Sequence, residues 1–336
     1  MKKGLTRLIV IFISIGVIFS AGVLILYLFK TTKLTTRLSI DTEIFASYGA
    51  LVGGVLGSIF SLAGVIMLIK TLESQEKAIE NQQKNFDKQL FETKFFNLLN
   101  IHRENRLQIN IRDRNGGKIF LSMQREFGLC KEVIESVSIS TIGGDLKLSK
   151  EEIINISYLC FFFGAVGDIS TQILDAKLKK YEIYLDSIFN SFKDYQRSIQ
   201  QKGGFDYKPF EGHQSRLGHY FRHLFQTIRF VDNQPSNLFT YREKYNYIKI
   251  LRAQLSNQEQ VLLCYNSLSD LGEFWERSKE IKDYQGLITK YNLITNIPKG
   301  YTYGIDARKY YPYVKYDGET EVNQRKRLKQ LYEIHN

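Results

Sequence analysis

The chain has 336 residues and a formal net charge of +11, and 43% of its residues are hydrophobic. Only four prolines favour long helices over a turn-rich β architecture. The cysteines, Cys130, Cys160 and Cys264, are widely separated and support neither a disulfide framework nor a zinc knuckle, which indicates core thiols in a reducing compartment. The positive charge suits contact with anionic lipid, and a polyanion such as nucleic acid is the alternative.

The first apolar segment covers residues 8–29 and contains no charged side chain. Its 22 residues exceed the roughly 20 that a transmembrane helix needs, and basic residues flank it on both sides. A cleaved signal peptide is the alternative, but its apolar part is normally about 7–15 residues long and ends at small residues. This segment ends in LYLFK, so we predict a transmembrane helix.

A second uncharged segment covers residues 44–69. It carries small residues at every fourth position, namely Gly49, Gly53, Gly57 and Ser61. This spacing gives one smooth helix face that another helix can approach closely, although glycine is also common in transmembrane helices generally. We predict that the face packs on the first span or on the same helix of a second copy, giving a homo-oligomer within the lipid bilayer.

Two spans return the chain to the side on which it starts. Lys2, Lys3 and Arg7 precede the first span, and four lysines follow the second between residues 70 and 88. The bias of positive charge is weak, but it favours a multi-pass protein with cytoplasmic N- and C-termini.

The rest of the sequence predicts a mostly α-helical protein. A polar helix continues from residue 70 to about residue 110 and becomes apolar at residues 90–99, where we expect it to enter a core. Further helices are predicted at residues 120–137, at 153–166 behind the capping pair Ser149 and Glu152, and at 168–200. The predicted parts are a transmembrane hairpin (1–70), a linking helix (71–110), a helical-bundle cytoplasmic domain (91–298) and a tail rich in Tyr and Lys (299–336), which is irregular until a short basic helix at its end.

Residues 211–233 hold the candidate functional residues. On a helix over residues 213–231, Arg216, His219, His223 and Gln226 share one polar stripe, with Arg222 beside it. Two histidines four residues apart can bind one metal ion, but no third ligand and no HExxH motif is evident. The stripe is alternatively a structural polar network, which is the simplest interpretation.

A third interpretation of the stripe is catalytic. Six residues separate Arg216 from His223, which resembles the R-x4–6-H signature of the HEPN ribonuclease superfamily. In that superfamily, Arg and His are thought to act on an RNA phosphate and 2′-hydroxyl, and the two side chains are suited to that chemistry. Leu217 departs from the signature, because a polar residue usually follows the Arg.

A neighbouring segment, residues 245–275, contains two further predicted helices, the second of which starts at the capping pair Ser256 and Glu259. Four polar residues lie within its apolar pattern and are predicted to join the polar network: Arg252, Gln254, Glu259 and Asn266. The sequence has no phosphate-binding P-loop, no G-x-G-x-x-G fingerprint and no G-x-S-x-G elbow, so we expect no cofactor and no metal.

Three blocks of sequence resemble the bacterial phage abortive infection protein family: KFFNLLNIHR (94–103), RLGHYFRHLFQTIRFVD (216–232) and YIKILRAQLSNQEQVLLCYN (247–266). The resemblance covers about residues 91–293, and members are similar to this chain in placing two transmembrane helices first. It implies a protein of the bacterial inner membrane that arrests or kills an infected cell in response to a phage or defence-system trigger. Similar two-span proteins are thought to serve as effectors in retron-type systems by damaging that membrane.

These observations give two function hypotheses and leave open whether the chain is an enzyme. The first is a membrane effector that oligomerises through its glycine face and perturbs the inner membrane. The second is a membrane-tethered, HEPN-like ribonuclease that uses Arg216 and His223, with RNA as its substrate. A scaffold that only recruits partners is a third, weaker alternative.

Overall fold

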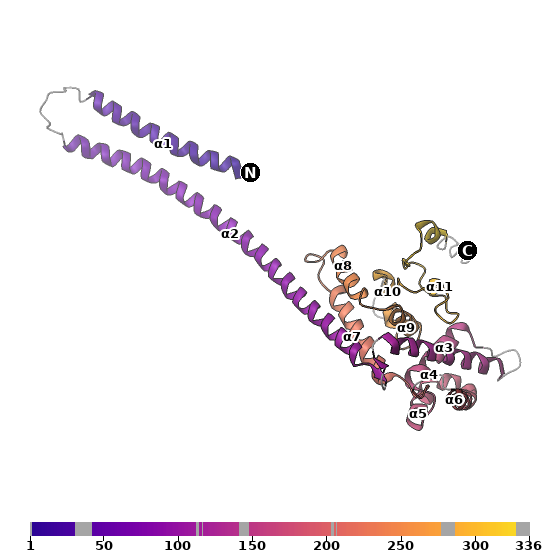
Figure 1. Ribbon diagram of the computed structural model, residues 1–336. Helices are drawn as coiled ribbons and strands as arrows, with labels where there is room; N and C mark the ends of the chain where they lie inside the picture. The colour runs from indigo at the N-terminus through magenta and orange to yellow at the C-terminus, as the bar shows by residue number, and fades with distance from the viewer. Residues whose placement is uncertain are drawn as a thin grey trace. The chain divides into compact units, whose positions relative to one another are not determined.

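The protein is described by a computed structural model that covers residues 2–30, 42–111, 114–115, 117–140, 148–202, 205, 207–276 and 286–326. It divides into two units, Met1–Gln89 and Leu90–Asn336 (Figure 1). The fold is mostly helical, as predicted. Within the described ranges, the strands are a two-residue antiparallel pair in which Asn110 lies opposite Asn115.

The elements follow one another along the chain with short connections. The helices longer than eight residues are α1 (Lys2–Lys30), α2 (Thr42–Gln108), α3 (Gly117–Ser140), α4 (Lys150–Phe163), α5 (Asp168–Lys177), α6 (Glu182–Lys202), α7 (Gln214–Asp232), α8 (Tyr241–Arg252) and α9 (Asn257–Ser267). The short elements are β1 (Asn110–Ile111), β2 (Arg114–Asn115), η1 (Lys179–Tyr181), η2 (Glu273–Trp275), α10 (Leu287–Tyr291) and α11 (Ala307–Tyr310).

The first unit contains α1 and the beginning of α2. Among the described residues, one helix is long and apolar enough to cross a membrane, and it is the Gly49–Gln108 part of α2. The apolar stretch that meets the same criteria in α1, Ile13–Leu26, is shorter. The second predicted span therefore lies in a helix that meets the length and composition of a transmembrane segment, whereas the first span remains a prediction. The connection between them, residues 31–41, lies outside the described residues.

The glycine face of α2 is open in the single chain. A Cβ atom at Gly49, Gly53 or Gly57 would meet no atom within 4 Å, and Ser61 is exposed. The close approach between the two helices is elsewhere, because a Cβ atom at Gly16 of α1 would lie 3.1 Å from Cδ2 of Leu56. Of the two partners predicted for the glycine face, the first span does not cover it here.

The second unit starts where α2 becomes apolar, at the predicted point of entry into the core. Phe91, Phe95, Leu99 and His102 are buried, at the three- and four-residue spacing of one helix face. The Phe91 ring lies 4.4 Å from that of Phe239 and 4.9 Å from that of Tyr247, measured between centroids. This aromatic cluster attaches the last turns of α2 to the segment around α8.

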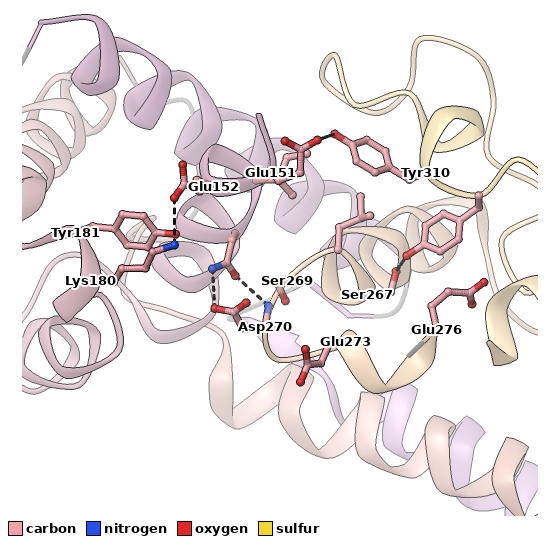
Figure 2. A pocket seen from close by; sticks show the side chains of 14 residues that line it. Glu151, Glu152, Lys180, Tyr181, Ser267, Ser269, Asp270, Glu273, Glu276 and Tyr310 are labelled. Carbon is pink, nitrogen blue, oxygen red and sulfur yellow. Dashed lines mark hydrogen bonds and ion pairs between the residues drawn. The ribbon is translucent and has the colours of Figure 1, made fainter. Parts of the chain in front are cut away.

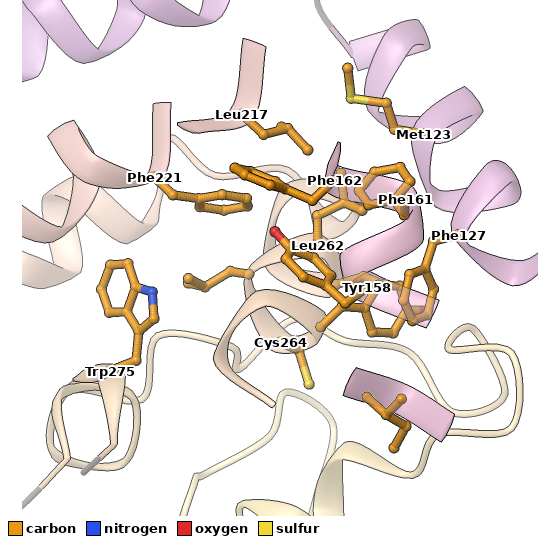
Figure 3. Packing of buried hydrophobic residues seen from close by; sticks show 14 of the residues in the cluster. Met123, Phe127, Tyr158, Phe161, Phe162, Leu217, Phe221, Leu262, Cys264 and Trp275 are labelled. Atoms are coloured by element: carbon orange, nitrogen blue, oxygen red, sulfur yellow. The ribbon is translucent and has the colours of Figure 1, made fainter. Parts of the chain in front are cut away.

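Helix α4 is the centre of the second unit. Every residue from Ile153 to Phe163 is buried, as expected for a continuous apolar run that neighbours surround. It packs on α3, α7 and α9, and Figure 3 shows its aromatic side chains among those of the neighbouring helices. The predicted capping box is confirmed, because the Ser149 side chain accepts from the Glu152 N–H and the Glu152 carboxylate accepts from the Ser149 N–H.

The prediction of one helix over residues 168–200 is wrong. Helix α5 ends at Lys177, the 3₁₀ turn η1 follows, and α6 begins at Glu182. The bend allows Leu174 and Leu178 on one side and Leu185 and Ile188 on the other to be buried together. In a straight helix, residues 174 and 188 would lie about 21 Å apart along the axis, at roughly 1.5 Å per residue. The apolar spacing is the same across the bend, so the sequence pattern did not reveal it.

The C-terminal tail packs on the core instead of extending from it. Tyr311, Val314 and Tyr316 are buried, and the Tyr311 hydroxyl lies 2.6 Å from Oγ of Ser267 in α9. Residues 321–326 are helical, and the rest of the basic helix predicted at the end, residues 327–336, lies outside the described residues.

Candidate functional site

Helix α7 carries the candidate site, and its bounds match the predicted helix to within one residue at each end. Its buried side is made of apolar and aromatic side chains together with one threonine: Leu217, Tyr220, Phe221, Leu224, Thr227, Ile228 and Val231. The polar stripe occupies the other side of the helix, and the last turns of α2 supply partners for part of it.

His219 pairs with Asn105 of α2. The distance from Nε2 of His219 to Oδ1 of Asn105 is 3.2 Å, and the His219 side chain is exposed. Asn105 is buried, and its amide nitrogen has no partner. This contact connects the predicted stripe to the only helix that runs into the second unit from the apolar segment.

His223 faces a second histidine, which the sequence analysis did not select. The rings of His223 and His102 are nearly parallel, with centroids 6.1 Å apart, and the Tyr220 ring lies 5.0 Å from that of His102. Both ring nitrogens of both histidines are shielded from solvent and have no hydrogen-bond partner. Burial lowers the pKa of His102 to about 4, with His223 and Arg106 adding to the effect, and burial followed by His219 lowers that of His223.

We expect acid to destabilise the domain through His102. Its pKa in the folded chain lies below the ordinary value of 6.5, so folding favours the neutral ring. The stabilisation is complete above pH 6.5 and is lost as the pH falls toward 4, by about 3 kcal/mol. Denaturant unfolding of the full chain between pH 7.5 and 4.5 measures this loss. His102→Phe should flatten the acid side of the profile, and an unchanged slope in that variant would contradict the assignment.

Glu259 is the buried acid of the site. Its side chain is fully buried, and Oε1 accepts from the Tyr220 hydroxyl at 2.8 Å and lies 3.1 Å from Nε of Arg106. Oε2 accepts from the N–H and the hydroxyl of Ser256, which completes the predicted capping box of α9. One carboxylate therefore joins the start of α9 to α7 and to the end of α2.

Arg216 lies in different surroundings from His223. Its Nη1 donates to the Gly212 carbonyl at 3.4 Å, and the side chain lines a cavity with Glu126 and His213. Both ring nitrogens of His223 lack a partner, so no hydrogen bond joins the two residues of the ribonuclease signature. The stripe is continuous along α7, but its two ends contact different parts of the domain.

The sequence analysis missed Glu126, which is fully buried on α3. It accepts from the Tyr207 hydroxyl at 2.5 Å and from the Phe210 N–H at 2.7 Å, and it lies 3.0 Å from Nε2 of His213. Burial and the Glu126 charge raise the pKa of Tyr207. A charged residue within an otherwise apolar helix pattern was the available signal, but its partners lie more than eighty residues away in the sequence.

The other predicted network residues are dispersed. Arg222 and Gln226 are exposed and line an apolar groove of about 780 Å³ with Phe162, Phe225 and other residues. Arg252 donates to the carbonyls of Tyr291 and Asn292 and makes no recorded contact with the stripe. The remaining two differ in burial, since Gln254 is exposed, whereas Asn266 is buried between Tyr158 and Trp275.

An acidic cavity of about 370 Å³ lies apart from α7, beside α4 and η1 (Figure 2). Its wall carries five carboxylates and one lysine: Glu151, Glu152, Asp270, Glu273, Glu276 and Lys180. Part of this charge is bound internally, because Asp270 accepts from the Asn155 amide and Lys180 pairs with Glu152. In the part of the chain that the structure describes, no group of three or more His, Cys, Asp and Glu side chains is arranged to hold a metal ion.

Comparison with known proteins places the α7 region in a family. Residues 212–301 match the family model described as "Putative phage abortive infection protein". The matched segment contains Arg216, His219, His223 and Glu259, whereas His102, Arg106 and Glu126 lie before it. Searches of curated proteins and of solved structures gave no match. The family resemblance predicted from the sequence is thus confirmed over residues 212–301, and through this segment the chain groups with the phage abortive infection proteins.

Proposed function

We propose that this chain is a membrane-anchored effector of abortive infection that arrests or kills the infected cell by perturbing the inner membrane. The family match over α7–α10 supports the role in defence. The apolar part of α2 supports the attachment to a membrane, with α1 as the second span and both termini in the cytoplasm.

Helix α2 is the observation that carries the mechanism. The same continuous helix, Thr42–Gln108, contains the apolar segment and ends in residues that contact α7 and α9. His102, Asn105 and Arg106 on its last turns meet His223, His219 and Glu259, respectively. A trigger that rearranges this polar contact therefore acts on the helix that enters the bilayer, and the open glycine face is the surface through which copies associate.

The proposal is tested by following membrane potential and RNA integrity together after infection of cells that carry the protein. Depolarisation that precedes any loss of RNA supports the membrane effector. RNA cleavage in cells that keep their membrane potential would contradict it and would favour the HEPN-like ribonuclease. A reporter fused after Asn336 should also be active in the cytoplasm, because two spans return the chain to its starting side.

His223→Gln distinguishes the two functions at the level of one side chain. Glutamine keeps hydrogen-bonding groups but does not exchange a proton near neutral pH. In a membrane effector we expect this variant to stay folded and protective. If His223 is a general acid or base, protection should vanish with an unchanged melting temperature, because about 10²–10⁴-fold of rate is lost. Arg216→Lys, which keeps the charge but loses the planar fork, is the companion variant.

A further inference from the structure

The cavity around Arg216 is polar on nearly every side. It has a volume of about 470 Å³, which lies in the range of small-molecule sites at roughly 300–1,000 Å³. Its wall comes from the start of α7, the loop before it, α3 and β1. All lining residues except one glycine have polar side chains: Asn110, Glu126, Tyr207, Lys208, Glu211, Gly212, His213 and Arg216.

The negative charge of Glu126 is satisfied from within the protein. Three donors or ring atoms, from Tyr207, Phe210 and His213, surround its two oxygens at 2.5–3.0 Å. A carboxylate only accepts hydrogen bonds, so in this form Nε2 of His213 carries the hydrogen. Glu126 therefore orients His213 at the cavity wall and has little remaining capacity to bind a ligand itself.

One polar atom of the wall is left over. His213 is 2% exposed, and its Nδ1 has no hydrogen-bond partner. A buried polar atom without a partner costs about 1–3 kcal/mol, which is unusual beside an acid that is so completely bonded. The side chain is positioned with care, and the atom on its other side is unused.

The remaining charges of the wall are cationic and stand at a helix start. The first turn of α7 contains no acidic residue and carries Arg216, although the positive end of a helix dipole normally favours Asp or Glu there. Lys208, which is exposed, adds a second cation, and the exposed Glu211 is the one acid of the wall that is not enclosed by the protein. Two cations at a helix N-terminus form a suitable environment for a phosphate group.

We propose that this cavity binds a small, soluble, phosphorylated molecule with hydroxyl groups, such as a ribose phosphate or ribonucleotide. Arg216 and Lys208 contact the phosphate, and His213, held by Glu126, faces the hydroxyl-bearing part. The site is independent of the membrane mechanism proposed above, so its failure leaves that mechanism intact. Arg216 is then a binding residue whose histidine partner is His213, three residues before it, and not His223.

The test uses the purified full-length protein in a neutral detergent, with ribose 5-phosphate as the probe and ribose as its uncharged counterpart. Calorimetric titration should detect ribose 5-phosphate and not ribose. We expect Arg216→Gln to weaken binding at least tenfold and Lys208→Gln several-fold. Glu211→Gln should strengthen binding several-fold, because it removes a repelling charge, an effect that a purely structural role would not produce. Arg242→Gln, an exposed arginine on α8, is the matched control and should change nothing.

Several outcomes would overturn the proposal. They are equal affinity for ribose and ribose 5-phosphate, undiminished binding by a folded Arg216→Gln variant, or no binding of the phosphate by the wild-type chain. Short-chain phosphatidylglycerol in the same detergent gives the lipid arm. Binding of that lipid in the absence of ribose 5-phosphate binding would assign the site to a membrane headgroup and not to a soluble ligand.

Discussion

Gly53→Leu and Gly57→Leu are each expected to abolish protection against phage while the protein still inserts into the membrane. Both positions are exposed in the single chain, with space for a Cβ atom and no neighbour within 4 Å. Leucine is apolar and suits a lipid environment, so insertion should be unaffected. Its side chain holds two helices apart where glycine lets their backbones touch, so association of copies through this face should fail.

The experiment compares phage survival, membrane fractionation and cross-linking for each variant. Gly22→Leu in α1 is the matched control, because a Cβ atom there also meets nothing within 4 Å but the residue lies off the glycine face. We expect the control to protect and to cross-link like the wild-type chain. Full protection by both α2 variants would mean that the apolar segment is only an anchor.

Glu259→Ala is expected to lower the free energy of unfolding by about 3–5 kcal/mol, the usual consequence of removing one partner from a buried ion pair. The substitution leaves Arg106, the Tyr220 hydroxyl and the Ser256 N–H without their acceptor. Tyr220 is buried, so its hydroxyl cannot turn to water instead. Urea denaturation of the full chain in detergent measures the change.

Glu152 provides the control for Glu259 within the same molecule. It occupies the same position in a chemically identical Ser-x-x-Glu capping box, but its side chain is 31% exposed and its ionic partner, Lys180, is 75% exposed. Glu152→Ala should therefore cost about 1 kcal/mol, as for loss of a cap at the surface. Similar losses for the two variants would show that the capping interaction, and not the buried network, accounts for the effect at Glu259.

Local sequence signals predicted the elements that depend on neighbouring residues. The capping pairs before α4 and α9 located both helix starts, and the apolar run of α4 marked a buried helix because every face of it is covered. The break between α5 and α6 was missed because neither Gly nor Pro marks it. Its cause is the shape of the core, which a one-dimensional pattern does not contain.

The candidate site shows the same division. Arg216, His219 and His223 were placed on one helix face correctly, because helical spacing alone determines that face. Their partners were not predicted, since His102, Asn105 and Glu126 are brought to α7 from segments 84 to 121 residues earlier by packing of the domain. The sequence indicated that polar groups on α7 needed partners, but only the fold identifies which residues supply them.

The buried tail changes how the limits of the family segment are understood. The match ends at residue 301, yet Tyr311 hydrogen-bonds with Ser267 in the middle of the segment, and the Gln124 amide donates to the Tyr301 carbonyl from α3. Residues on both sides of the match thus complete its interior. The unit that natural selection can vary independently is larger than the recognisable motif, and substitutions in residues 302–316 should be tolerated as poorly as those in α9 itself.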